Sequence, residues 1–88
     1  MTQLRLTNHF KEKLTKLDTK SQKSIHKALR IMLENPRHPS LRTKKMEGVE
    51  HIFEASANMD IRITFHYEKP DTLVLRNCGH HDDTLRNP

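Results

Sequence analysis

The chain has 88 residues and a hydrophobic fraction of only 33%, which suits one domain with a thin core. The 16 lysines and arginines outnumber the 11 acidic residues, and the net charge of +5 favours a phosphate-bearing or acidic partner. A single cysteine excludes an intramolecular disulfide framework, and no run resembles a signal peptide or a membrane span. We therefore expect a single cytoplasmic domain over residues 1–88, with no membrane partner.

Helical periodicity dominates the first part of the chain. An alternating stretch at 2–6 predicts a short edge strand. Apolar residues spaced by three and four then predict a helix that begins near Thr7 or Asn8. A second helix is predicted from Ser21 onward, and the Asn-Pro pair at 35–36 ends it. The two helices form a hairpin whose apolar stripe needs a sheet to cover it.

A basic loop is predicted at 36–48, after the second helix. It contains the strongest positive cluster of the chain, and its cations suit contacts with flanking phosphates. The candidate phosphate-binding residues are Arg37, Arg42, Lys44 and Lys45, joined by Arg76 if the register of its strand turns it to the same side.

Strand-like alternation replaces the helical pattern after the loop. Residues 51–57, 61–67 and 72–78 are predicted strands, and the turns at 58–60 and 68–71 are short enough for antiparallel hairpins. With the N-terminal strand in or beside this meander, the pattern predicts an α+β fold. The helix hairpin packs on one face of a roughly four-stranded antiparallel sheet.

The other face of this sheet is predicted to be an open polar surface. Alternation places Arg62, Thr64 and His66 opposite the apolar residues of the middle strand. Glu54 and Ser56 belong to the same face on the neighbouring strand. A solvated polar face is ordinary for an antiparallel sheet, so the types of side chain on it carry the functional argument.

These side chains fit a metal-free ribonuclease, which needs a base, a fixed cation and an acid. Arg62 suits the cation, because its planar fork pairs two phosphate oxygens. His81 or His80 suits the base or the acid, since imidazole titrates near neutral pH. Glu54 either takes the remaining proton transfer or neutralises Arg62. The histidine pair also fits a solvated tail, and Cys78 fits a small core residue better than a nucleophile.

No cofactor or metal is expected. The run His-His-Asp-Asp at 80–83 offers only adjacent ligands, which rarely converge on one ion, and no second cluster has ligand spacing. The four remaining scattered histidines outside the polar face are interpreted as surface residues.

The order of the motifs resembles a known family. The chain contains KKMEG at 44–48, IFEA at 52–55, DIRITF at 60–65 and GHHDDTL at 79–85. This order resembles the RelE/ParE superfamily of type II toxin–antitoxin toxins and, within it, the RelE and YafQ-like mRNA interferases. The resemblance spans nearly the whole chain and implies a RelE-like microbial RNase fold.

The resemblance also implies a function and a partner. It implies a toxin that enters the ribosomal A site, contacts 16S rRNA, cleaves mRNA without metal by 2′-hydroxyl attack and is silenced by a cognate antitoxin. Arg62 matches the family arginine that stabilises the transition state, and His81 matches the proton-transfer histidine of the Gly-x-His ending. Asp60 matches an acid of the YafQ-like subgroup, and Lys44 falls near a basic position of the loop.

The chain departs from the family pattern at two places. Phe53 and Ala55 stand where RelE has lysines, and Leu85 stands where the family often has an aromatic residue that stacks on a base. The superfamily also contains ParE-like gyrase poisons and weakly active members. A gyrase poison, or an inactive homologue that mainly binds its antitoxin, therefore remains an alternative to the endoribonuclease.

Overall fold

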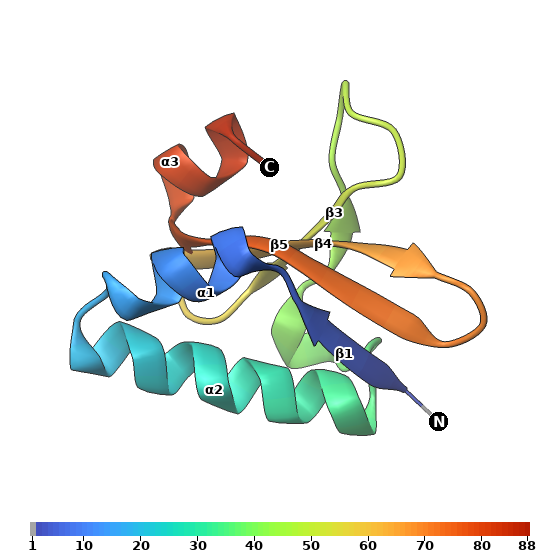
Figure 1. The fold of residues 1–88 in the computed structure, drawn as a ribbon, viewed down its shortest axis with the longest axis horizontal. Coiled ribbons are helices and arrows are strands. Elements are labelled where there is room, and N and C mark those ends of the chain that lie inside the picture. The colour runs from blue at the N-terminus through green and yellow to red at the C-terminus, as the bar shows by residue number, and fades with distance from the viewer. Residues whose placement is uncertain (1) are drawn as a thin grey trace.

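A computed structural model describes residues 2–88, and its elements follow the predicted order (Figure 1). Among these residues no helix combines the length and the apolar character needed to cross a membrane. The elements are β1 (Gln3–Leu6), α1 (Asn8–Thr15), α2 (Thr19–Glu34), the 3-10 turn η1 (Pro39–Leu41), β2 (Lys44–Lys45), β3 (Phe53–Ser56), β4 (Ile61–Glu68), β5 (Thr72–His80) and α3 (His81–Arg86).

The described strands form one sheet in the order β1-β5-β4-β3-β2. The α+β prediction and the antiparallel meander of β3, β4 and β5 are confirmed. Two details differ from the prediction. The basic loop contributes the short strand β2 as a fifth strand, and β1 pairs with β5 in parallel, which the long stretch of chain between them permits.

The hydrophobic core lies between the helix hairpin and the sheet. Phe10 of α1 and Ile25 and Met32 of α2 are fully buried against Ile63 and Phe65 of β4. Figure 1 shows α1 and α2 on the same side of the sheet, with α3 on the other side. The meander therefore presents its second face toward α3.

The first helix begins where the sequence predicts. The Thr7 hydroxyl accepts a hydrogen bond from the Phe10 N–H at 3.1 Å and so caps α1. The same hydroxyl donates to the Leu75 carbonyl at 2.8 Å. One side chain thus fixes the start of the helix hairpin to the central part of β5.

Helix α3 corrects the expectation of a fully open polar face. Thr84 is buried in α3, and a Cβ on Gly79 would lie 3.1 Å from its hydroxyl oxygen. Gly79 has a φ of +147°, a conformation that side chains disfavour, so glycine permits both the backbone and the close packing. The Asn77 side chain donates to the Asn87 carbonyl at 2.8 Å and holds the segment after α3. The helix was missed because only six residues form it and its packing residue is polar.

Candidate active site

Arg62 lies on the sheet face opposite the helix hairpin, as its alternation predicts. It is the second residue of β4 and pairs with Ser56 on one side and Gly79 on the other. Directly opposite residues in an antiparallel pair share a face. The neighbours of the guanidinium are therefore the small hydroxyl side chain of Ser56 and Gly79, which has no side chain. This leaves room beside Arg62 on the face that α3 only partly covers.

The turn before β4 holds the guanidinium of Arg62. Its Nη1 donates to the carbonyls of Asn58 at 2.8 Å, Met59 at 3.1 Å and Ile61 at 3.2 Å. The Asn58 side chain in turn accepts from the N–H groups of Asp60 and Ile61, which stabilises the turn. Within residues 2–88 every hydrogen bond of the Arg62 side chain comes from Nη1. Nε and Nη2 are therefore available for a bidentate anion.

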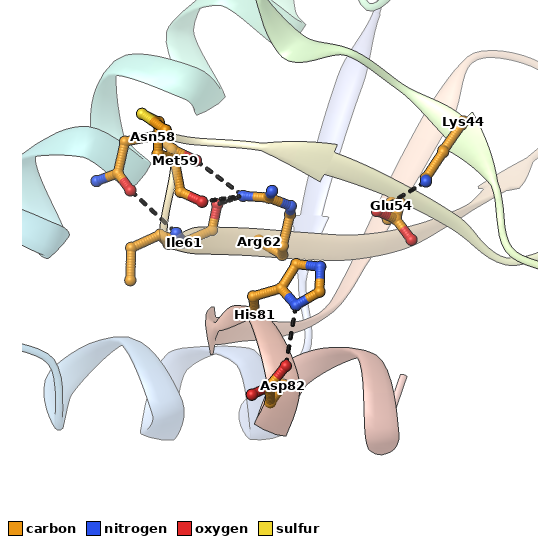
Figure 2. A network of polar contacts seen from close by, with 8 residues as sticks. All are labelled: Lys44, Glu54, Asn58, Met59, Ile61, Arg62, His81 and Asp82. Carbon is orange, nitrogen blue, oxygen red and sulfur yellow. Dashed lines mark hydrogen bonds and ion pairs between the residues drawn. The ribbon is translucent and has the colours of Figure 1, made fainter.

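His81 comes to the same place from the far end of the sheet. Its backbone N–H donates to the Asp60 carbonyl at 2.9 Å, which joins the start of α3 to the start of β4. The ring Nδ1 lies 3.1 Å from Oδ1 of Asp82. Because an ionised carboxylate only accepts, Nδ1 carries the proton and Nε2 is left for a ligand. Figure 2 shows the His81 ring turned toward the Arg62 side chain.

Glu54 lies on the same face but pairs with a different cation. Its carboxylate is buried, and the nearest charged atom is Nζ of Lys44 at 4.0 Å, on the paired position of β2. No ion pair joins Glu54 to Arg62 among the described residues, so the interpretation that Glu54 neutralises this arginine is wrong. Glu54 is two strand positions from Ser56, about 7 Å along the sheet. Figure 2 shows the Lys44–Glu54 pair farther along the sheet from His81.

His80 borders one hollow together with His81 and Asp60, and it also reaches the other side of the sheet. It pairs with Ile61 and follows Cys78 by two positions, so it lies on the side of the helix hairpin. There it lines a hollow together with Asp18 at the start of α2. Asp60 is exposed beside the first turn of α3, where it reaches the Arg62 face and the hollow on the other side.

The four predicted phosphate-binding residues of the basic loop border one groove, although Lys44 and Lys45 occupy alternating positions of β2. Neighbouring residues of a strand alternate, so Lys44 shares the face of Glu54, whereas Lys45 pairs with Phe53 on the helix side. Arg37 and Arg42 line a groove on that helix side. Lys44 and Lys45 therefore start from opposite faces of β2, but both border this groove together with Arg37 and Arg42.

Arg76 is tied to the end of the chain. Its Nε donates to the Pro88 carbonyl at 3.1 Å, and its Nη1 lies 3.0 Å from Nδ1 of His66. Because the register shifts between Thr64 and Phe65, Arg76 has no paired residue on β4. This arginine supports the segment that follows α3.

Cys78 is a core residue. The thiol is buried, and its Sγ is 3.7 Å from the Phe10 carbonyl oxygen. Burial raises the pKa of the Cys78 thiol to about 12, so it remains protonated at neutral pH. Within residues 2–88 no three or more His, Cys, Asp and Glu side chains are grouped to hold a metal ion.

Sequence reasoning missed two supporting residues. Asp82 orients the His81 ring, and Asn58 shapes the turn that holds Arg62. The run Asn-Met-Asp before the middle strand carried a signal for the second, because asparagine in this position commonly bonds to the backbone two residues on. A carboxylate next to a histidine in sequence is too common a pattern to be singled out.

The fold that carries this site is the RelE-like fold of bacterial and archaeal toxins. YafQ from E. coli strain BL21(DE3) matches with a TM-score of 0.75 and 8% sequence identity, over 94% of this chain and 97% of that one. RelE in the archaeal RelE–RelB complex from Pyrococcus horikoshii OT3 matches with a TM-score of 0.75 and 13% identity, over 92% and 96%. The YoeB/ParE toxin from Agrobacterium tumefaciens matches with a TM-score of 0.74 and 13% identity, over 91% and 99%.

These likenesses are visible only in three dimensions. No protein-family model matches the sequence, and no curated protein matches it significantly. At such low identities the comparisons establish the fold. The activity has to be argued from the residues of this chain.

Proposed function

We propose that the protein is the toxin of a type II toxin–antitoxin pair and acts as an endoribonuclease that cleaves mRNA on the ribosome. The observation that supports this proposal is that the His81 ring is turned toward the Arg62 side chain on the sheet face that α3 only partly covers (Figure 2). The register sets Arg62 opposite Gly79, two residues before His81, and the Asp60 carbonyl binds the His81 N–H. A phosphodiester between these two side chains would contact a fixed cation and a titratable ring.

The reaction that suits these groups is 2′-hydroxyl attack. A base removes the 2′ proton, the 2′ oxygen bonds to phosphorus, and the bond to the 5′ oxygen breaks as an acid protonates it. The products are a 2′,3′-cyclic phosphate and a free 5′-hydroxyl. Arg62 would stabilise the charge that grows on the phosphate, because its held Nη1 leaves Nε and Nη2 for two phosphate oxygens.

His81 is assigned to one of the two proton transfers. Its Nε2 is free for the substrate because Asp82 binds Nδ1, and about half of its side chain is exposed. Asp60, beside the first turn of α3, or Glu54, two positions along the sheet from Ser56, supplies the other transfer. Lys44 would bind a neighbouring phosphate from its place beside Glu54.

A cognate antitoxin is part of this proposal. The intact E. coli RelBE complex and the DinJ–YafQ complex from the same organism are toxin–antitoxin complexes that contain proteins of this fold. For this chain, the net charge of +5 suits an acidic segment of the antitoxin. Such a segment would neutralise the surface that otherwise binds RNA.

Expression without antitoxin tests the proposal. Wild type, Arg62→Ala and His81→Ala are induced separately, and the ends of cellular mRNAs are mapped. We expect codon-phased cleavage with the wild type and a 10²- to 10³-fold loss with Arg62→Ala, the usual cost of removing one transition-state donor. His81→Ala should lose 10² to 10⁴, as is typical of a missing acid or base.

His26→Ala is the matched control, because it removes an exposed histidine from α2 on the other side of the sheet. It should cleave like the wild type. If all four proteins behave alike, or if growth arrest comes with DNA damage and intact mRNA, the endoribonuclease is excluded. The second result would support a gyrase poison, and a silent protein that still binds an antitoxin would support a binding module.

A further inference from the structure

A groove of about 470 Å³ lies on the helix side of the sheet, away from Arg62 and His81. It opens between the segment after α2 and the strands β2, β3 and β4. The residues that line it are Pro36, Arg37, His38, Pro39, Arg42, Thr43, Lys44, Lys45, Phe53 and Tyr67.

Aromatic rings form one wall of this groove. Tyr67 meets Phe53 edge to face at a centroid distance of 5.1 Å and meets Phe65 in the same way at 5.6 Å. Phe53 stacks on Phe65 at 5.8 Å, and Phe65 is fully buried in the core. The Tyr67 side chain remains 48% exposed although its ring is fixed by two neighbours. A rigid, half-exposed ring is suited to stacking on a planar group.

The rest of the groove is cationic. Arg37, Arg42 and Lys45 are exposed, no acidic residue lines the groove, and no ion pair engages these three in the part of the chain that the structure describes. The hollow of about 680 Å³ next to His80 differs, because its lining mixes two lysines with Asp18 and Asp60. Of these two hollows in the described residues, only the first combines exposed cations with an aromatic wall.

Arg42 connects this groove to the Arg62 face. It lines the groove and also a smaller hollow of about 260 Å³ that contains Ser56 and Arg62. Strand β2 pairs with only the first two residues of β3, so beyond them the edge of β3 is bordered by the turn that precedes Arg42. Tyr67 is five positions from Arg62 on β4, about 17 Å along the strand. A few nucleotides span such a distance.

We propose that this groove binds a single-stranded RNA segment that continues from the cleavage site, with one base stacked on Tyr67 and its phosphates held by Arg37, Arg42 and Lys45. The proposal deepens the proposed function and rests on it in taking RNA as the ligand. A nucleotide explains both features of the groove, because it presents a flat base and an anionic phosphate. An acidic peptide would use only the cations. The ring at Tyr67 also supplies the base stacking that Leu85 in α3 cannot provide.

The chain contains its own probe for this proposal. Tyr67 is the only tyrosine, and there is no tryptophan, so intrinsic fluorescence reports on the groove alone. The purified wild type is titrated with a short oligoadenylate that carries 2′-O-methyl riboses and cannot be cleaved. We expect its binding to quench the tyrosine emission. His26→Ala, on α2 outside the groove, should show the same quenching.

A labelled form of the same oligonucleotide measures the affinities of variants. Tyr67→Ala should weaken binding about fivefold or more, whereas Tyr67→Phe, which keeps the ring, should bind like the wild type. Arg37→Ala should make the slope of log binding constant against log salt concentration shallower by about 0.7, the value for one phosphate contact of a single strand. Lys23→Ala removes an exposed lysine of α2 outside the groove and should leave the affinity for the oligonucleotide unchanged.

Each outcome decides one proposal. Tyrosine emission that does not change on titration overturns the proposal that the groove binds RNA. Wild-type affinity of a Tyr67→Ala protein whose thermal melt matches the wild type does the same. Either result leaves the proposed mRNA cleavage standing. Quenching without ribosomal cleavage by the wild type overturns the endoribonuclease and leaves the groove. If Tyr67→Ala does not fold, the wild-type quenching and Arg37→Ala carry the test. Polyglutamate that binds the groove where oligoadenylate does not would identify an acidic protein partner and overturn the inference.

Discussion

The two faces of the sheet differ in how their polar side chains are held. On the α3 face, three backbone carbonyls bind Arg62, and a carboxylate binds His81. On the helix side, Arg37, Arg42 and Lys45 are exposed and have no ion-pair partner in residues 2–88. Stabilising a transition state requires groups that are already in position, whereas binding a flexible polyanion tolerates mobile cations. The contrast separates a candidate for chemistry from a candidate for substrate affinity.

The largest expected effect comes from comparing one variant on each face for both cleavage and RNA binding. Arg62→Ala should lower ribosomal cleavage 10²- to 10³-fold, while oligoadenylate still quenches the tyrosine emission of this variant. Tyr67→Ala should weaken substrate binding and leave the rate of cleavage at saturating ribosomes within a few fold. Single-turnover cleavage and labelled-oligonucleotide binding, measured on both variants, check the prediction. Variants that lose both properties together would show that the faces do not act separately.

A smaller effect concerns the packing that brings α3 to the Arg62 face. Gly79→Ala should destabilise the fold by about 1–3 kcal/mol, because alanine would be strained at a φ of +147° and its Cβ would lie 3.1 Å from the Thr84 hydroxyl. Thr84→Ala removes a hydroxyl that has no hydrogen-bond partner within the described residues, so it should be nearly neutral. In the double variant the contact is relieved and the backbone strain remains.

Thermal denaturation and ribosomal cleavage measure these three variants. A loss of about 1 kcal/mol should lower the melting temperature of a domain of this size by roughly 4–8 °C. Gly79→Ala should also reduce cleavage, since the shift of α3 moves His81, while quenching at Tyr67 persists. A Gly79→Ala protein with wild-type stability and cleavage would contradict the role assigned to this glycine.

The smallest effect lies in the core between the faces, at Cys78. Burial raises the pKa of its thiol to about 12 from an ordinary 9.0, so the folded state retains a proton that the unfolded chain loses above pH 9. The stability contributed by the thiol is therefore complete below pH 9 and falls as the pH rises toward 12. The stability difference between wild type and Cys78→Ala should narrow by about 1 kcal/mol between pH 9 and pH 10.

Urea denaturation of both proteins at a series of pH values checks this. Iodoacetamide should modify Cys78 only when the chain unfolds. A constant stability difference across this pH range, or rapid alkylation of the native protein, would mean that the thiol is accessible.

Periodicity and turn residues predicted most of the fold. The spacing of Phe10 and Leu14 and the capping threonine located α1, and alternation located β3, β4 and β5. The same alternation assigned Arg62 to the face away from the helices. What it did not provide was the parallel pairing of β1 with β5, because the partner of an edge strand depends on contacts distant in sequence.

The site was predicted less completely because strand alternation fails at irregular positions. His80 and His81 are adjacent, yet one belongs to the end of β5 and the other to the first turn of α3, so strand alternation cannot place His81. Lys44 and Lys45 form a two-residue strand in a segment that the sequence predicted as loop, so their side chains start from alternate faces. Only the register reveals that Glu54 faces Lys44 rather than Arg62.

The double hydrogen bond of Thr7 has a consequence for folding. It joins two positions that are 68 residues apart, and β1 lies beside β5 in the same region. Closing so long a stretch of chain is slow compared with forming the local helix hairpin. During synthesis, α1 and α2 therefore emerge with an uncovered apolar stripe, and the core that covers it is complete only when β5 has been made.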